Sequence, residues 1–203
     1  MKIICIGRNY SDHAKEMHAP IPENPIFFFK PDTCLLRNNN PFFYPNFSEK
    51  IEYELEVVVK INRLGRNINE RFAHRYYNEI GLGVDFTARD IQQKCKENGL
   101  PWEISKAFDG SSPISTFVKI DELGSVNNLD FWLEKNGVEI QRGNTAQMLF
   151  SVDKIICYIS KFTTLKIGDL IYTGTPAGVG PVTIGDRLKG YLSGKLMLDF
   201  FVR

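Results

Sequence analysis

Alternation of polar and apolar positions marks the clearest strand in the chain, over residues 52–61. Three acidic positions alternate there with three apolar ones: Glu52, Tyr53, Glu54, Leu55, Glu56 and Val57. A period of two places the two sets on opposite faces of a strand. Valines continue through residues 57–59, and an unbroken apolar run indicates a strand that is buried on both faces at that end.

The remaining pattern predicts short strands interrupted by a few helices. Further strands are predicted at residues 2–6, 26–29, 80–85, 129–135, 138–142, 170–173 and 195–202, with 26–29 buried, and helical spacing occurs at 9–18, 69–79, 87–99 and 152–162. Thr87 with Asp90 predicts the start of the third helix and Gly99 its end. Asn136-Gly137 is a strong two-residue hairpin signal. We therefore expect an α+β domain, a mixed, strand-rich roll with helices at its edge.

Charge, apolar runs and cysteine content limit the partners and the cellular location that the sequence predicts. The 25 Lys and Arg balance 24 Asp and Glu, so net charge gives no reason to bind nucleic acid or an anionic membrane. The first apolar run ends at Gly7, too early for a secretory signal, and no stretch is long enough to span a membrane. The four cysteines form no CxxC pair and are expected to be reduced and mostly buried. A cytoplasmic protein is expected.

The three glutamates of residues 52–56 admit two interpretations. A solvated strand face explains them as well as a metal site does, from the pattern alone. The valines at 57–59 favour burial, and buried like charges oppose one another unless a cation joins them. Asp85 follows a short apolar strand, where a helix dipole alone would account for it. With Glu54 and Glu56, however, it completes an all-oxygen set that suits Mg²⁺, Mn²⁺ or Ca²⁺ better than zinc.

A histidine and a glutamate near the start of the chain form a candidate acid–base pair. His13 and Glu16 are three residues apart and share a face if the segment is helical. Histidine is the usual general base near neutral pH, and a carboxylate orients it. Such a pair is more often an ordinary surface pair. His18 and His74 have no comparable context, and His74 is expected to face solvent.

Residues 173–180, TGTPAGVG, contain three glycines that allow backbone amides to approach an anion. The segment lacks the GK[ST] ending of a P-loop and the strand–GxGxxG–helix context of a dinucleotide site. A small carboxylate ligand fits this pattern better than a nucleotide. A plain glycine-rich turn is the alternative.

Several motifs, taken together and in this order, resemble the fumarylacetoacetate hydrolase family. They are GRNYSDH (7–13), YELE (53–56), VDFTARDIQ (84–92), GLPW (99–102), SKAFD (105–109) and TGTPAGVG (173–180). The similarity covers almost the whole chain and is greatest to the short, single-domain branch, which includes acylpyruvate hydrolases and oxaloacetate decarboxylases. It implies one catalytic domain over residues 1–203, with a lid within 1–25, a mixed β-roll fold and a homodimer. The 15 phenylalanines also suit a buried interface.

The resemblance assigns roles to individual positions. Glu54, Glu56 and Asp85 would hold Mg²⁺ or Mn²⁺, with Ca²⁺ possible in a crystal. Lys106 would face the substrate, and His13 with Glu16 would form the catalytic dyad of the lid. Four further positions would bind the substrate or support its site: Arg89, Gln92, Gly174 and Thr175. Two features depart from the long members of the family: their N-terminal domain is missing, and Glu52 extends the acidic face.

The implied reaction is metal-dependent hydrolysis of a carbon–carbon bond in small 2,4-dioxo acids, acylpyruvates such as acetylpyruvate or fumarylpyruvate, through a metal-stabilised enolate. Oxaloacetate decarboxylation, and isomerisation or tautomerisation of an oxo-dioate, would use the same enolate and are the alternatives. Two interpretations come from other classes. Glu54 and Glu56 could be a glycosidase acid–base pair, which would need no metal, or the chain could bind dicarboxylates without catalysis.

Overall fold

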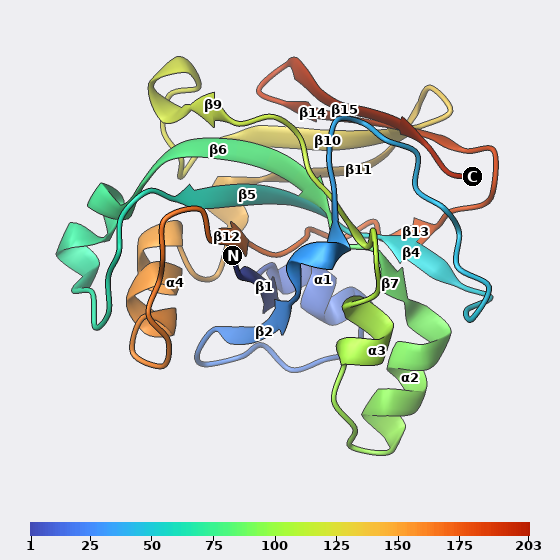
Figure 1. Cartoon of the computed structure of the whole chain (residues 1–203), viewed down its shortest axis with the longest axis horizontal. Helices are drawn as coiled ribbons and strands as arrows, with labels where there is room; N and C mark the ends of the chain where they lie inside the picture. Colours follow the sequence, from blue (N-terminus) through green and yellow to red (C-terminus); the bar gives the residue numbers. More distant parts are fainter.

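A six-stranded mixed sheet crosses the middle of the computed structural model, which describes residues 1–203 (Figure 1). Its strand order is β2-β1-β12-β5-β6-β9. In chain order the strands are β1 Ile3–Gly7, β2 Ile26–Lys30, β5 Leu55–Ile61, β6 Tyr77–Val84, β9 Val118–Lys119 and β12 Leu170–Tyr172. Strands β1 and β12 pair in parallel, and the other neighbours are antiparallel. The sheet is therefore mixed, as expected.

A four-stranded antiparallel sheet, in the order β11-β10-β14-β15, packs against β5 and β6 (Figure 1). Its strands are β10 Asp130–Lys135, β11 Val138–Asn144, β14 Arg187–Leu192 and β15 Lys195–Phe201. Two small sheets complete the strands: β13 Gly180–Pro181 with β4 Ile51–Tyr53 and β7 Thr87–Ala88, and β3 Leu35–Leu36 with β8 Ser112–Pro113. The expected α+β, strand-rich fold is confirmed.

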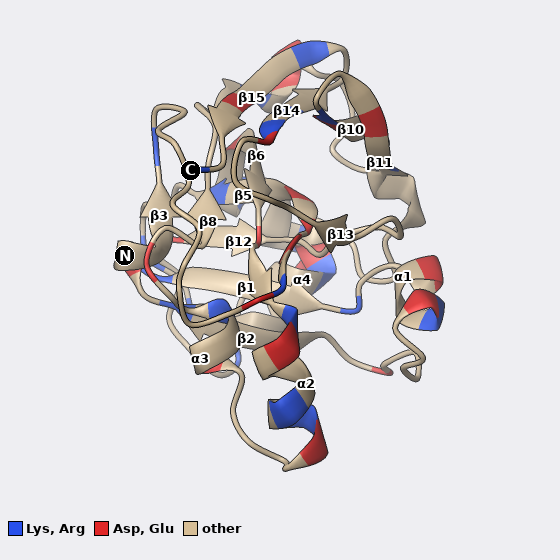
Figure 2. Cartoon of the chain, turned by 90° about the vertical axis from the view of Figure 1, so that its right-hand side faces the viewer, with Lys and Arg blue, Asp and Glu red and all other residues tan.

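The helices lie around these sheets. They are α1 Ser11–Glu16, α2 Arg89–Glu97, α3 Glu103–Lys106 and α4 Val152–Ile159. Short 3₁₀ helices are η1 Asp32–Cys34, η2 Glu70–Tyr76, η3 Ile120–Glu122 and η4 Thr145–Gln147. Acidic and basic residues both occur along α1 and α2 (Figure 2). No helix is long and apolar enough to cross a membrane.

The apolar core explains the valine run. Val57 belongs to the cluster between the two large sheets, Val59 to the cluster beneath α4, and Val58 to a third cluster with Tyr172. All three valines are fully buried, because both faces of β5 are covered. The prediction for this end of the strand is confirmed. The hairpin is confirmed as well: Asn136 and Gly137 have φ of 54° and 83° between β10 and β11.

Four local predictions are wrong. The strand at residues 52–61 is interrupted at Glu54, which separates β4 from β5, so the alternating glutamates do not share one regular strand face. The helical spacing at 69–79 gives only a 3₁₀ helix, because β6 begins at Tyr77 to pair with β5. Strand β2 is an edge strand, so Phe29 is 42% exposed instead of buried.

The fourth concerns the start of α2. Thr87 lies in β7, and Ala88 is the N-cap residue, without a side-chain bond. The Thr87 hydroxyl donates instead to Glu54 Oε1, at 3.1 Å. The helix ends at Glu97, with Gly99 at φ 62° just beyond it, close to the predicted end. The threonine therefore contacts the acidic cluster described below and does not cap the helix.

Close packing at β6 leads to a stability prediction. A Cβ added at Gly83 would lie 2.5 Å from Cε1 of Tyr172, a fully buried ring whose hydroxyl donates to Pro113 O. Gly83→Ala should therefore lower the free energy of unfolding by about 1–3 kcal/mol, the usual cost of overpacking. Gly7→Ala, whose Cβ would be 3.8 Å from its nearest neighbour, should change it by less than about 1 kcal/mol. Urea denaturation of both variants checks this, and equal effects would contradict it.

Candidate active site

One cavity collects side chains from most of the predicted site positions. It holds about 470 Å³ of empty space, part of it open to solvent. Its walls come from β1, α1, β2, the β4–β5 break, the end of β6, α2, α3 and the glycine-rich loop. The lining residues are Ile6, Gly7, Arg8, His13, Met17, Phe28, Glu54, Glu56, Asp85, Arg89, Gln92, Lys96, Trp102, Lys106 and Thr175. Of the predicted site residues, only Glu16 and Gly174 are not on the cavity wall, and both contact residues that are.

Three buried carboxylates meet at one end of the sheet. Glu54 lies at the break before β5, Glu56 within β5, and Asp85 directly after β6. The backbone holds the first and last together, because Asp85 N–H donates to Glu54 O at 2.8 Å. One oxygen from each of the three carboxylates lies within 4.8 Å of the others. The sequence grouping is thus reproduced in space.

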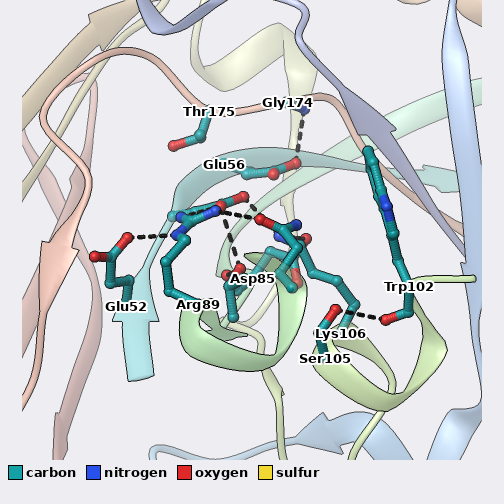
Figure 3. Close-up of polar contacts among 12 residues, drawn as sticks. Glu52, Glu56, Asp85, Arg89, Trp102, Ser105, Lys106, Gly174 and Thr175 are labelled. Carbon is teal, nitrogen blue, oxygen red and sulfur yellow. Dashed lines mark hydrogen bonds and ion pairs between the residues drawn. The ribbon is translucent and has the colours of Figure 1, made fainter. Parts of the chain in front are cut away.

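Buried cations face two of these carboxylates (Figure 3). Lys106 Nζ donates to Glu54 Oε2 at 2.8 Å and to Asp85 Oδ2 at 2.9 Å. Lys30 Nζ donates to the other Asp85 oxygen at 2.7 Å. Arg89 donates to Glu54 Oε1 at 2.6 Å. Glu56 has one partner only, the Gly174 N–H at 2.7 Å, so its second oxygen is free toward the cavity.

These contacts shift the pKa values of Glu54 and Glu56 in opposite directions. Burial alone would raise the pKa of Glu54, but the charges of Lys106 and Arg89 hold it well below its usual value. Burial, followed by the charges of Asp85 and Glu54, raises the pKa of Glu56 well above its usual value. Burial would lower the pKa of Lys106, but the same two neighbouring carboxylates raise it to about 12. Lys106 is therefore a fixed positive charge.

The donor set fits a hard divalent ion. All three groups offer carboxylate oxygens, which Mg²⁺ and Mn²⁺ prefer, and neither histidine nor cysteine joins them. Opposite ligands of an octahedral Mg²⁺ are separated by about twice the ~2.1 Å metal–oxygen distance, close to the 4.8 Å spread of the three oxygens. Three protein ligands also leave coordination positions for a substrate. The cluster can hold such an ion with small side-chain movements.

Glu52, whose role the sequence left open, lies outside this cluster. Its carboxylate accepts from Arg89 Nε at 2.6 Å and pairs with Lys50 at 3.2 Å. Figure 3 shows Arg89 between Glu52 and the cluster. Glu52 therefore helps to hold the guanidinium that contacts Glu54. Arg89 also donates to Gln92 Oε1 at 2.7 Å, so both predicted helix residues belong to one network.

Helix α1 places His13 on the cavity wall. His13 is 6% exposed, and its Nδ1 lies 3.0 Å from Glu16 Oε2. The other Glu16 oxygen accepts from Gly178 N–H at 3.0 Å. A carboxylate can only accept, so Nδ1 donates to Glu16, and in the neutral form of the ring the nitrogen that can accept a proton is then Nε2. The pair is thus part of a contact between α1 and the glycine-rich loop, rather than an isolated surface pair.

The glycine-rich loop uses its amides differently from the expectation. Gly174 N–H donates to Glu56 and Gly178 N–H to Glu16, so both bind carboxylates of the chain itself. Thr175 Oγ1 donates to Leu55 O at 2.8 Å. The prediction that the loop amides cradle a small ligand carboxylate is wrong for these two amides, because the buried Glu56 and the exposed Glu16 occupy them.

Two supporting residues escaped the sequence reasoning. Lys30 is 2% exposed at the end of an aromatic strand. Its position directly after three phenylalanines is the only sequence feature that could have indicated its burial. Gln141 donates to Thr175 Oγ1 and to Pro176 O and accepts from Leu55 N–H. It thereby joins β11 to the loop and to β5. No sequence motif identifies Gln141, because its partners are distant in the chain.

Comparison with known proteins matches residues 2–197 to the model of the fumarylacetoacetate (FAA) hydrolase C-terminal family. The mitochondrial oxaloacetate tautomerase of Bos taurus is 41% identical over 200 residues, 98% of this chain and 90% of that protein. The mitochondrial oxaloacetate decarboxylase of Dictyostelium discoideum is 43% identical over 194 residues, 95% and 89% of the two chains. The fumarylpyruvate hydrolase of Pseudomonas aeruginosa, solved with Mn²⁺ and pyruvate, superposes with a TM-score of 0.94 at 36% identity, covering 100% of this chain and 89% of that one.

Replacement of one acidic side chain tests the metal site. Glu56→Gln removes a charge with little change of shape, so divalent-ion affinity should fall by more than the roughly 10–100-fold typical of losing an outer-shell partner. Glu52→Gln is the matched control, because Glu52 is not in the cluster, and it should change affinity by less than about tenfold. Calorimetric titration with Mg²⁺ and Mn²⁺ measures both. Undiminished binding by Glu56→Gln would exclude this residue as a ligand.

Proposed function

The chain belongs to the fumarylacetoacetate hydrolase family, and from this premise we propose that it is a metal-dependent enzyme that interconverts the keto and enol forms of oxaloacetate. The observation that carries the proposal is the convergence of His13 and the acidic cluster on one cavity. Relatives named as oxaloacetate tautomerase and decarboxylase, similar over nearly the full chain, support this substrate. The ranking of candidate reactions expected from the sequence therefore changes. Enolisation of a 2-oxo dicarboxylate becomes the preferred candidate, and acylpyruvate hydrolysis becomes the second.

The metal site has a defined part in this proposal. Glu54, Glu56 and Asp85 would hold Mg²⁺ or Mn²⁺, and the bound ion would supply Lewis acidity that favours loss of a proton beside the 2-oxo group. Lys106, fixed between Glu54 and Asp85, adds a permanent positive charge on the cavity wall. Such a charge lowers the cost of negative charge that develops on the substrate.

His13 moves the proton. Its Nε2, free because Nδ1 pairs with Glu16, removes one hydrogen from C3 of oxaloacetate. The electrons of the C3–H bond become the C2–C3 double bond, and the electrons of the C2–O double bond move to the 2-oxo oxygen. This oxygen takes a proton from water to complete the enol, and His13 releases to water the proton that it removed. In the reverse direction, the protonated His13 returns a proton to C3. The contact of Glu16 with Gly178 holds the lid helix and the imidazole over the substrate.

The loop and α2 position the substrate. Thr175 is fixed by its bonds to Leu55 O and Gln141, and Gln92 by its bond to Arg89. Both side chains line the cavity and present pre-oriented polar atoms without a further loss of side-chain freedom. In this proposal the free Nε2 hydrogens of Gln92 donate to the carboxylate or the 2-oxo oxygen of the substrate. Thr175, whose hydroxyl hydrogen is donated to Leu55 O, shapes the cavity beside it, and Arg89 supports Glu54.

Hydrolysis of an acylpyruvate is the second candidate. The fumarylpyruvate hydrolase with Mn²⁺ and pyruvate has nearly the same fold, and the same His13 could deprotonate an attacking water. That reaction breaks a carbon–carbon bond and releases pyruvate, whereas enolisation breaks only a C–H bond. The product therefore separates the two candidates.

We also propose that residues 1–203 form one catalytic domain whose lid includes α1, within residues 1–25. The homodimer and the cytoplasmic location stay predictions, and a small 2-oxo acid is the proposed partner. Because the tautomerase and decarboxylase relatives are named as mitochondrial, cell fractionation is the test of the predicted cytoplasmic location. Light scattering at micromolar concentration tests the dimer.

A substrate panel tests the proposed reaction. With Mg²⁺ present, the wild-type enzyme should exchange C3 hydrogens of oxaloacetate and interconvert its keto and enol forms with a higher kcat/KM than it releases pyruvate from acetylpyruvate or fumarylpyruvate. A chelator should abolish every activity, because each depends on the same metal site. Ultraviolet absorbance of the enol and coupled detection of pyruvate measure the rates. Faster cleavage of an acylpyruvate would reverse the assignment.

Substitution of the lid histidine tests the proposed base. His13→Ala should lower kcat for oxaloacetate enolisation by about 10²–10⁴-fold, the usual contribution of general acid–base catalysis, with little change in oxalate affinity. His18→Asn is the control, because His18 is exposed on the same segment, and asparagine tolerates its φ of 50°. Rates within a few-fold of wild type for His13→Ala would assign the proton transfer to another group.

A further inference from the structure

Two of the four cations that line the cavity have no partner in the chain. Arg89 and Lys106 are bound to the buried carboxylates. Arg8 and Lys96 also line the cavity, but neither forms a salt bridge or a side-chain hydrogen bond. Lys96 Nζ lies 6.0 Å from the centroid of the Trp102 ring, at the outer limit of a cation–π contact. Two unpaired cations in one cavity leave a place for an anion.

Helix α2 places Lys96 beyond the acidic cluster. Arg89, Gln92 and Lys96 are three and four residues apart, so they form one stripe of the helix, and all three line the cavity. Arg89 contacts Glu54 at one end of this stripe. At a rise of about 1.5 Å per residue, Lys96 starts about 10 Å further along the helix axis. Unlike Lys106, Lys96 forms no salt bridge to the carboxylates of the cluster, so its ammonium group is free to bind the ligand.

Arg8 is held in an unusual backbone conformation. Its φ is 58°, a left-handed value that costs free energy in any residue other than glycine. The chain after it is fixed, because the buried Asn9 side chain donates to Thr173 O at 2.7 Å and accepts from Phe150 N–H at 2.8 Å. The backbone that carries Arg8 is thus rigid, while the guanidinium has no partner in the chain. Retained strain of this kind is typical of positions that bind ligands.

The charges of the wall support the same interpretation. Burial, followed by the charges of Arg89 and Arg8, lowers the pKa of Lys96. Lys96 therefore lies in surroundings that already repel a further positive charge. An anion bound beside it would relieve that repulsion, and a neutral group would not.

We propose that Arg8 and Lys96 bind the distal carboxylate of the substrate and so select 2-oxo dicarboxylates over 2-oxo acids with a neutral tail. The inference rests on the proposed function, which places the other end of the substrate at Glu54, Glu56 and Asp85. It adds a second recognition point, which distinguishes oxaloacetate by charge from an acylpyruvate with a neutral tail, such as acetylpyruvate. Arginine and lysine are the residues that bind a carboxylate with charge-assisted hydrogen bonds.

Two unreactive ligands test this site without turnover. N-oxalylglycine and N-propyloxamate share the carboxylate–carbonyl head, and neither has a carbon-bound hydrogen beside its 2-oxo group, but only the first has a distal carboxylate. With saturating Mg²⁺, the wild-type protein should bind N-oxalylglycine more tightly. Lys96→Met and Arg8→Gln should each weaken that ligand by about 10–100-fold, the loss expected for a charged hydrogen bond, and leave N-propyloxamate within a few-fold.

Lys94→Met is the matched control, because Lys94 is exposed on the same helix and does not line the cavity. It should leave both affinities unchanged, whereas Lys96→Glu should weaken N-oxalylglycine more than Lys96→Met does. Equal affinity of the two ligands for wild type, or an unchanged preference in Lys96→Met and Arg8→Gln, would overturn the inference.

Turnover measured in parallel separates this result from the proposed function. If the wild-type enzyme does not enolise oxaloacetate but keeps its preference for the charged tail, the proposed function fails and the carboxylate site stands. If oxaloacetate is enolised and KM is unaffected by both substitutions, the reaction stands and the carboxylate site fails. Where both hold, Lys96→Met should raise KM for oxaloacetate and not for acetylpyruvate.

Discussion

Mutual repulsion among buried carboxylates is the constraint on which the site depends. Glu54, Glu56 and Asp85 are each at most 6% exposed, with oxygens within 4.8 Å of one another. Water does not screen these charges, so each must gain a cation or a hydrogen-bond donor. Lys30, Lys106 and Arg89 supply the cations. Glu56, with only one amide donor, is the group whose charge a divalent ion would neutralise most directly.

Several irregular features of the fold serve this cluster. The break between β4 and β5 sets Glu54 apart from the regular strand and lets it face Lys106. Thr87 gives its hydroxyl to Glu54 and leaves α2 without a side-chain cap. The amide of Gly174, at φ 99°, points at Glu56. At each of these points the backbone or side chain departs from a regular strand, cap or turn because a buried charge requires a partner. Such departures are typical of functional sites.

These exceptions explain how much the sequence could predict. Patterns that depend on local backbone chemistry were correct: the Asn136-Gly137 hairpin, the valines of β5 and the end of α2 near Gly99. The grouping of Glu54, Glu56 and Asp85 in space also followed from their types and their positions at strand ends. The partners of these groups could not be predicted, because Lys30 and Gln141 approach them from strands distant in the chain. Edge exposure of β2 likewise depends on sheet order, which periodicity does not contain.

The cavity contains an acidic cluster and, apart from it, other polar and charged residues. This separation helps to explain why relatives with one fold are named for enolisation, decarboxylation and carbon–carbon cleavage. All three reactions place negative charge beside a 2-oxo group, and in the proposed function a divalent ion held by the acidic cluster, together with Lys106, would stabilise that charge. The outcome must therefore be decided elsewhere: by the proton carrier on the lid, and by what lies beyond the reacting carbons. In this chain α1 presents His13, which pairs with Glu16, and the cavity also contains two unpaired cations, Arg8 and Lys96. Two cations of this kind favour a substrate with a second carboxylate, so recognition of the substrate's tail can change among relatives while the acidic cluster stays the same.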